Sequence, residues 1–311
     1  MAIKHCVYQG DRDRQRMMAL AQAYPQANLH CIDLPYRFSS WAFDSVETIG
    51  LWEDTQGRLV AWAVLQTPFW AIDAVFHPTV EAGVHAQVLE WAEAQAQRVR
   101  DSPYGRPIWF INVFDWQRQR QRDLEDHGFI AQTNQGANAW TKVLLKHPHV
   151  GALRPAALPE GWTIRPLGGL DEVEAYVALH RAVFESTSMT AAWRARTLQH
   201  PEYRPETDMV AINPAGELVA FCIGWFSASG IDGRPCGQIE PLGVRSDMRR
   251  SGIGRALLSE TVRRLYAMGA VQVIVETDNQ RSAALTLYTS VGFRAIENVL
   301  VYRKDLPTPV R

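Results

Sequence analysis

Cysteine is scarce in this chain, and its few copies follow no pattern typical of disulfide or metal binding. Four cysteines occur in 311 residues, and no two of them form a Cys-x-x-Cys pair. Disulfide-stapled domains and zinc modules both need several closely spaced cysteines. The sequence therefore predicts neither a disulfide framework nor a zinc site, and we expect no bound metal.

Long apolar runs and an excess of one charge sign are also missing. No stretch approaches the length of a membrane span, about 18 apolar residues, and the start of the chain lacks the apolar core of a signal peptide. The formal net charge is −1 at pH 7, whereas nucleic-acid binding requires a basic surface. These absences predict a cytoplasmic protein that binds neither membrane nor nucleic acid.

Length and internal similarity predict two domains. A chain of 311 residues is long for one ordinary domain and natural for two. Residues 56–62 (QGRLVAW) are similar to residues 215–221 (AGELVAF), and both predict a turn that leads into an apolar strand. Residues 115–129 and 279–293 likewise share a turn, a helix and a Gly-Phe exit. The separation of the copies is nearly constant, at about 160 to 165 residues, which indicates a duplicated domain.

The segment between the two copies is rich in proline, alanine and glycine, as linkers often are. We therefore place a first domain at residues 1–146, a linker at residues 147–160 and a second domain at residues 161–311.

The most informative segment is a basic turn with two closely spaced glycines, Arg249-Arg250-Ser251-Gly252-Ile253-Gly254. It lies between a predicted strand at residues 238–244 and a predicted helix at residues 255–268. Such a turn directs free backbone N–H groups and the positive end of the helix dipole toward one point. The glycines lack a Cβ, so that a phosphate can approach the main chain, and the arginines add charged donors. The turn predicts a pyrophosphate site; the alternative is an ordinary tight turn with a solvated basic edge.

The sequence around this turn differs from two common phosphate loops. No lysine followed by Ser or Thr comes after the glycines, and no Gly-x-Gly-x-x-Gly opens a βαβ unit. Instead, the chain continues with a predicted strand at residues 271–275, a turn at 276–279, a helix at 282–290 and the pair Gly292-Phe293. Arg-x-x-Gly-x-Gly followed by this order of elements resembles the GNAT acyltransferase superfamily.

The resemblance implies an α/β (mixed α+β) fold of two tandem GNAT-like domains, each a twisted mixed sheet flanked by helices, as in mycothiol synthase-like proteins. It also implies that acetyl-coenzyme A (coenzyme A) is the cofactor and that the loop Arg249, Arg250, Ser251, Gly252, Ile253 and Gly254 binds it. In this family two strands part near such a turn, so Leu242 and Val244 are expected to pair with the pantetheine arm. Pro241 and Gly243 would otherwise indicate a simple bulge.

The same resemblance also implies catalytic or cofactor-binding roles for three further residues. Glu240 is the candidate general base, because an ammonium must lose a proton before its nitrogen can attack a thioester. Tyr288 is the candidate acid, because a phenol can protonate the departing thiolate. Asn279 matches a position that often contacts the cofactor. The alternatives are a solvent-facing carboxylate, a core tyrosine and a helix cap, respectively.

The first copy lacks these features. At the place of the basic turn it has residues 78–85, with one glycine and the acidic Glu81, and Leu124 stands at the place of Tyr288. We therefore expect the first domain to be a degenerate copy without a cofactor site.

These observations predict an N-acetyltransferase that moves an acetyl group to a primary amine of a small molecule, with Glu240 as base and Tyr288 as acid. A non-catalytic acyl-coenzyme A binding or regulatory protein is one alternative, and a protein N-terminal acetyltransferase is another. The oligomeric state is left open between a monomer and a homodimer.

Overall fold

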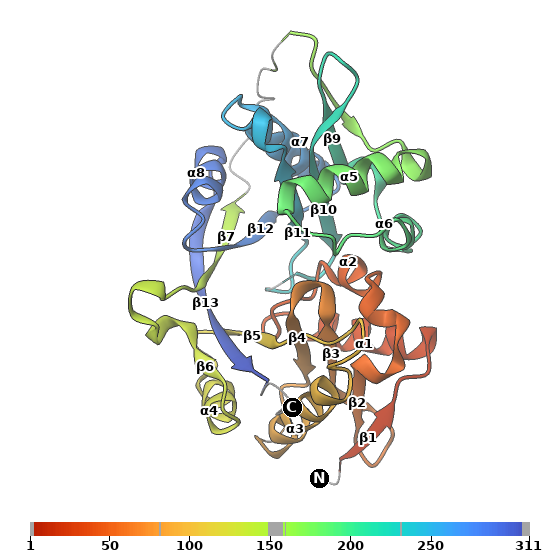
Figure 1. Ribbon diagram of the computed structural model, residues 1–311, viewed down its shortest axis with the longest axis vertical. Coiled ribbons are helices and arrows are strands. Elements are labelled where there is room, and N and C mark those ends of the chain that lie inside the picture. Colours follow the sequence, from red (N-terminus) through yellow and green to blue (C-terminus); the bar gives the residue numbers. More distant parts are fainter. Residues whose placement is uncertain (1–2, 81, 149–157, 159, 231, 307–311) are drawn as a thin grey trace. The chain divides into compact units, whose positions relative to one another are not determined.

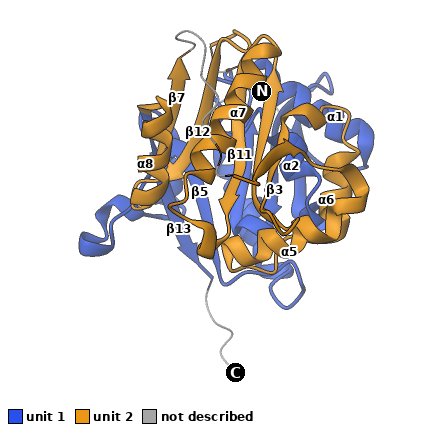
Figure 2. Cartoon of the chain, turned by 90° about the horizontal axis from the view of Figure 1, so that it is seen from above, with its two compact units in different colours: residues 1–142, 297–311 blue, residues 143–296 orange. Residues whose placement is uncertain are grey.

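The computed structural model describes residues 3–80, 82–148, 158, 160–230 and 232–306, and the path of the chain is drawn in Figure 1. Most of the predicted linker and Glu81 lie outside the described residues. The chain divides into two compact units (Figure 2), which are described separately below: unit 1 is residues 1–142 with 297–311, and unit 2 is residues 143–296.

Unit 1 contains a mixed sheet of order β1-β2-β3-β4-β5-β13, in which β6 also pairs with β13. All of the neighbouring strands are antiparallel except β4 and β5, which are parallel. The elements of this unit, apart from β13, are β1 (Lys4–Val7), α1 (Asp11–Ala23), α2 (Leu34–Phe38), β2 (Ile49–Glu53), β3 (Leu59–Gln66), β4 (Ala71–Phe76), α3 (Ala82–Arg98), β5 (Ile108–Phe114), α4 (Arg118–Asp126) and β6 (Ile130–Ala131).

Unit 2 has a similar mixed sheet of order β7-β12-β11-β10-β9-β8. The pairs β8/β9, β9/β10 and β10/β11 are antiparallel, and the pair β11/β12 is parallel. The elements are β7 (Lys142–Pro148), β8 (Thr163–Pro166), α5 (Val173–Phe184), α6 (Ala191–Leu198), β9 (Asp208–Ile212), β10 (Leu218–Ser227), β11 (Cys236–Val244), α7 (Ile253–Ala267), β12 (Gln272–Asp278), α8 (Ser282–Val291) and β13 (Arg294–Asp305). The fold is mixed α/β, as predicted.

The two units exchange strands. Strand β7 follows the first copy in the sequence, but from Val143 onward it belongs to unit 2, where Val143 and Leu145 pack in the core. Strand β13 ends the second copy, yet from Glu297 onward it belongs to unit 1, where residues 299–305 pair with β5. The predicted boundaries at residues 146 and 161 do not include this exchange, because a pattern along the chain carries no information about which sheet a strand joins.

Most predicted elements around the loop differ from the observed ones by one to three residues at their ends, and one predicted turn is largely part of a strand. The polar run 276–279 predicts a turn, but residues 276–278 complete β12, and Asn279 is the first residue after the strand. The alternating burial of this segment explains the difference, because Thr277 is buried while its neighbours are half-buried.

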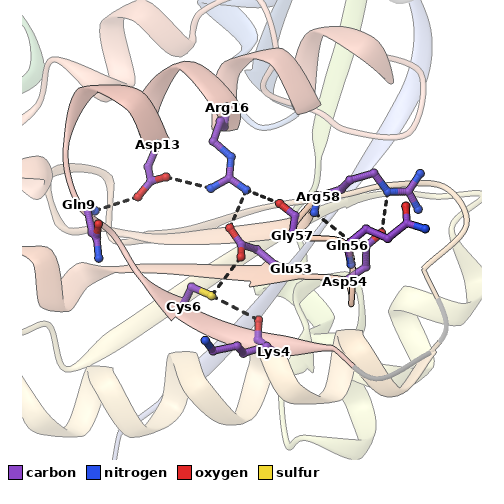
Figure 3. A network of polar contacts seen from close by, with 10 residues as sticks. All are labelled: Lys4, Cys6, Gln9, Asp13, Arg16, Glu53, Asp54, Gln56, Gly57 and Arg58. Carbon is purple, nitrogen blue, oxygen red and sulfur yellow. Dashed lines mark hydrogen bonds and ion pairs between the residues drawn. The ribbon is translucent and has the colours of Figure 1, made fainter.

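The similar segments of the two copies have the same local structure. In the turn after β2, the Asp54 side chain accepts hydrogen bonds from Gln56 N (2.8 Å) and Arg58 N (3.0 Å), as Figure 3 shows. In the corresponding turn after β9, Asn213 Oδ1 accepts from Ala215 N (3.0 Å) and Glu217 N (2.9 Å). Each turn thus uses a short Asp or Asn side chain to hold its backbone.

The Gly-Phe exits also match. Gly128 and Gly292 have φ angles of 76° and 109°, a left-handed conformation that suits a glycine helix cap. Phe129 N donates to Leu124 O at 3.0 Å, and Phe293 N donates to Tyr288 O at 3.1 Å. Leu124 and Tyr288 therefore occupy equivalent positions.

The core of unit 2 positions helix α7. Its residues Leu257, Leu258, Val262 and Leu265 are fully buried, as their helical spacing predicts. Burying each such side chain contributes about 1.5–3 kcal/mol. This contribution holds the amino end of α7 against the end of β11, where the predicted cofactor loop lies.

In the described part of the chain, all four cysteines are free, and no group of three or more His, Cys, Asp or Glu could hold a metal ion. The helices of these residues include none with the length and apolar character needed to cross a bilayer.

Candidate functional site

The predicted cofactor loop between β11 and α7 is an irregular turn that contains two left-handed residues. After Val244 the chain makes a 3-10 turn over Ser246–Met248 and a further turn through Arg249 to Gly252. Arg250 (φ 64°) and Gly252 (φ 87°) are both left-handed, whereas Arg249 is extended (φ −66°, ψ 154°). Arg249, Arg250, Ser251 and Gly252 are exposed, so this surface is accessible to a ligand.

The two glycines of the loop have different surroundings, and their predicted contact with a phosphate stays a prediction. A Cβ on Gly252 would meet no atom within 4 Å, so the space beside this residue is open. A Cβ on Gly254 would come within 3.1 Å of Val244 Cγ2 and 3.5 Å of Leu287 Cδ2. Gly254 therefore allows α7 to pack closely on β11 and α8. Ile253, between them, is fully buried and anchors the loop in the core.

The parallel strands β11 and β12 part where the resemblance places the pantetheine arm. Their register pairs run from Cys236↔Gln272 only to Gln238↔Ile274. On its other edge, β11 stays paired with β10 as far as Ala220↔Val244, with an irregularity between Cys222 and Gly224. Pro241 thus lies at the bulge, and Gly243 lies in the part of β11 that faces the opening.

The register decides which backbone groups face this opening. Arg245 N donates to Val219 O at 2.9 Å, so residues 219 and 245 form a hydrogen-bonded antiparallel pair. Such pairs alternate with non-hydrogen-bonded pairs, which makes Cys222↔Leu242 and Ala220↔Val244 non-hydrogen-bonded. The backbone groups of Leu242 and Val244 therefore point away from β10 and toward the opening, where an amide-containing chain could pair with them.

Glu240 lies on β11 at the start of this opening and is half-buried. Its carbonyl oxygen accepts a hydrogen bond from the buried Trp225 Nε1 at 2.6 Å. Sequence reasoning missed Trp225, because it is one apolar residue in a strand of apolar residues. The peptide bond from Glu240 to Pro241 is cis.

Tyr288 lies on α8 and is buried in the core of unit 2, with its ring edge-on to Phe293. Burial raises the pKa of the Tyr288 phenol, and the charge of Glu240 raises it further. Glu240 and Tyr288 therefore share one electrostatic environment, and the phenol is protonated at neutral pH. Both the core role and the candidate acid role fit this placement.

Asn279 is exposed just after β12. The residue that precedes α8 is Arg281, whose Nε lies 2.8 Å from Asp278 Oδ2. The alternative role of Asn279 as the cap of this helix is therefore wrong, and its predicted contact with the cofactor stays a prediction.

A buried ion pair under α5 and α6 was also missed by sequence reasoning. Arg194 and Asp208 are both fully buried and hydrogen-bonded to each other. The Arg194 guanidinium lies 3.8 Å from the centre of the Tyr176 ring, and Tyr203 Oη donates to Asp208 at 2.7 Å. The charge of Glu240 contributes, after burial, to the raised pKa of Tyr176, so this cluster borders the candidate site.

Comparison with known proteins finds a family match within unit 2 and relatives that are similar to about half of the chain. The model of the acetyltransferase (GNAT) family matches residues 173–293. The mycothiol acetyltransferase of Thermobispora bispora is 30% identical over 167 residues, which cover 51% of this chain and 56% of that protein. The mycothiol acetyltransferase of Propionibacterium freudenreichii is 31% identical over 158 residues, which cover 49% of each. The chain thus matches about half the length of these relatives.

Two solved structures resemble the whole chain in fold. A GCN5-related N-acetyltransferase from Sphaerobacter thermophilus has a TM-score of 0.66 and 18% identity, over 99% of this chain and 97% of that one. A tandem GNAT protein from the clavulanic acid biosynthesis pathway has a TM-score of 0.62 and 12% identity, over 99% of this chain and all of the other (100%). Both confirm the predicted fold class, and the second is by its name a tandem GNAT protein.

Proposed function

We propose that this protein transfers an acetyl group from acetyl-coenzyme A to a primary amine of a small molecule, because residues 173–293 match the acetyltransferase (GNAT) family. The observation that carries the proposal is the combination, within unit 2, of an opening between β11 and β12 and an exposed left-handed loop at the amino end of α7. The mycothiol acetyltransferases that resemble about half of this chain support a small-molecule acceptor.

The residues present fit coenzyme A. Leu242 and Val244 direct backbone groups into the strand opening, which suits the two amides of a pantetheine arm. The N–H groups of residues 249–254 and the dipole of α7 favour a pyrophosphate. Gly252 leaves space for a phosphate to approach. When bound, acetyl-coenzyme A supplies the activated thioester that the amine attacks.

In this proposal the side chains of Glu240 and Tyr288 move the protons. The Glu240 carboxylate accepts a proton from the substrate ammonium, either directly or through water, so that the nitrogen lone pair becomes available. The Tyr288 phenol, which its raised pKa keeps protonated, donates to the departing sulfur. The hydrogen bond from Trp225 Nε1 to the carbonyl of Glu240 holds the main chain that carries the base.

The test is an acetylation assay with the full chain, acetyl-coenzyme A and a panel of small primary amines. Because Cys6 is a free and partly exposed thiol that would react with thiol reagents, the products are measured by mass spectrometry. We expect at least one small amine to be acetylated with multiple turnovers per enzyme molecule. Acetylation of peptide amino termini alone would indicate the protein N-terminal acetyltransferase alternative. Coenzyme A binding without turnover of any acceptor would favour the non-catalytic alternative.

A further inference from the structure

Unit 1 contains a strand opening equivalent to that of unit 2. The parallel strands β4 and β5 share only the register pair Ala71↔Phe110. His77 N donates to Val60 O at 2.8 Å, so that pair is hydrogen-bonded and the next one, Ala61↔Phe76, is not. The backbone groups of Phe76 therefore face the opening, as those of Val244 do in unit 2.

Side-chain amides of the chain itself occupy the end of this opening. Phe76 N donates to Asn28 Oδ1 at 3.1 Å, and Asn28 Nδ2 donates to Phe76 O at 3.4 Å. Across the opening, Phe114 N donates to Gln117 Oε1 at 3.0 Å, and Gln117 Nε2 donates to Ala27 O at 2.8 Å. Asn28 and Gln117 are buried. Their side chains form hydrogen bonds with the backbone groups that a pantetheine arm would need. Only a small molecule could therefore enter the rest of the space between the two strands.

What remains is a cavity between β4 and β5 whose lining includes an arginine for which the described residues form no ion pair. Arg120 of α4 lines it together with His30, Asp73 and Asn112. In the described residues no carboxylate lies within 4.0 Å of the Arg120 guanidinium, and its one hydrogen bond, to Gln117 Oε1, is long at 3.4 Å. Its other contact is with the face of Phe76, at 4.9 Å. Burial lowers the pKa of Arg120 to about 10, although the charge of Asp123 opposes this shift, so the group is still cationic at neutral pH. The Asp123 carboxylate itself is hydrogen-bonded to His85 Nδ1 at 2.8 Å.

The other polar groups of the cavity do not neutralise this cation. Asp73 accepts two hydrogen bonds from Arg37 Nη1, at 3.1 and 3.0 Å, and is therefore already paired. Across the described chain, the buried atoms Asn112 Oδ1 and His30 Nε2 find no hydrogen-bond partner. Buried polar groups are normally hydrogen-bonded, so the cavity presents a cation, an acceptor and a ring nitrogen to whatever occupies it.

We propose that this cavity of unit 1 binds a small carboxylate that also carries a hydrogen-bond donor. The carboxylate would pair with Arg120, whose guanidinium matches it in geometry and charge. The donor would bind Asn112 Oδ1. The site is separate from the acetyltransferase site and does not depend on the proposed function of unit 2.

The test is isothermal titration calorimetry of the full chain with glycolate, which has a hydroxyl donor, with acetate, which has none, and with inorganic phosphate. Each titration is repeated with saturating coenzyme A. We expect glycolate to bind at least about tenfold more tightly than acetate and phosphate, and coenzyme A to leave its affinity unchanged. Arg120→Gln should weaken glycolate binding by about tenfold or more, as the loss of a charge-assisted hydrogen bond predicts.

Matched variants distinguish binding at the cavity from a general loss of charge. Arg122→Gln removes an exposed arginine of the same helix and should leave the affinity unchanged. Arg120→Lys keeps the positive charge and should retain part of the binding, which also covers the case that Arg120→Gln does not fold. Equal affinity in wild type and Arg120→Gln, preferential binding of phosphate, or loss of glycolate binding with coenzyme A present would each overturn the proposal.

Discussion

At the scale of single residues, the proposed reaction depends on a glutamate base and a tyrosine acid whose side chains are buried to different degrees. Glu240 is half-buried on a strand, and Tyr288 is buried on the helix after the next strand. Burial and the nearby negative charge both favour the neutral phenol. A carboxylate base and a protonated phenol can therefore coexist at neutral pH, as general acid–base catalysis requires.

Replacing the proposed base should separate binding from turnover. In Glu240→Gln we expect coenzyme A affinity to be retained and kcat to fall by about 10²–10⁴, because the variant cannot accept a proton. The acidic limb of the pH–rate profile should also disappear, since that limb reports protonation of the base. Glu217→Gln, which changes an exposed glutamate of the β9–β10 turn, is the control and should keep wild-type kinetics. Wild-type turnover and an unchanged pH profile in Glu240→Gln would exclude this base.

Replacing the proposed acid should slow turnover without loss of the cofactor. Tyr288→Phe keeps the ring that packs on Phe293 and removes only the hydroxyl, so kcat should fall by about 10²–10⁴. Since the pKa of this phenol is raised above its ordinary value of 10.0, the group stays protonated at and below pH 10, and the wild-type rate should show no loss from its ionisation in that range. The pH–rate profiles of both proteins measure this.

Tyr266→Phe is the matched control for the tyrosine. Tyr266 also carries a phenol with a raised pKa, but its hydroxyl is hydrogen-bonded to His147 of β7. Its removal should reduce the free energy of unfolding by about 1 kcal/mol and leave kcat unchanged. If Tyr288→Phe behaves in the same way, then Tyr288 serves packing alone.

At the scale of elements, helix α7 contributes to the stability of unit 2 and also carries the predicted cofactor loop. Its buried face is part of the core, whereas its amino end carries the loop in which Gly252 takes a left-handed conformation beside open space. Gly269 lies just beyond the other end of the helix, also with a positive φ (101°) and open space around it. The two glycines are therefore equivalent in backbone strain and differ only in which end of the helix they adjoin.

This equivalence gives a controlled test of the cofactor loop. Gly252→Val and Gly269→Val should both lower Tm, because valine is strained at positive φ. Only Gly252→Val should abolish the increase in Tm that coenzyme A produces by mass action, since only there would the new side chain block the phosphate. The measurement is thermal unfolding with and without coenzyme A. Equal ligand-induced shifts in both variants would place the pyrophosphate elsewhere.

At the scale of the whole molecule, both units have the same kind of strand opening, but the backbone groups at the opening have different partners. Both units have a pair of parallel strands that part after a short ladder. In unit 1, Asn28 and Gln117 occupy the freed backbone groups of Phe76 and Phe114. In unit 2, the corresponding groups of Leu242 and Val244 face the strand opening, at the proposed pantetheine site.

We therefore expect one coenzyme A per chain. Calorimetric titration of the full chain should give a stoichiometry of about one, and Gly252→Val should reduce it to zero. Arg120→Gln, which alters only the cavity of unit 1, should leave both stoichiometry and affinity for coenzyme A unchanged. Two equivalent sites per chain would contradict both the degenerate first copy and its closure by Asn28.

The sequence by itself determined the features that depend on short-range patterns. The glycine-spaced turn, the helical face of α7, the Gly-Phe exits and the duplicated turns all involve residues that are close along the chain. Their backbone preferences act locally, so they could be predicted together with the fold class. The family resemblance added the candidate roles of Glu240 and Tyr288, and in the structure burial and, after it, the charge of Glu240 raise the pKa of the Tyr288 phenol.

Only the tertiary structure decided which groups meet across the sheets. The exchange of β7 and β13, the support of Glu240 by Trp225, the packing role of Gly254 and the closure of the unit 1 opening by Asn28 all join residues far apart in sequence. Asn28 and Phe76, for example, are separated by 48 positions. Such contacts depend on strand register and on the total burial of each unit, and no local pattern records either of them.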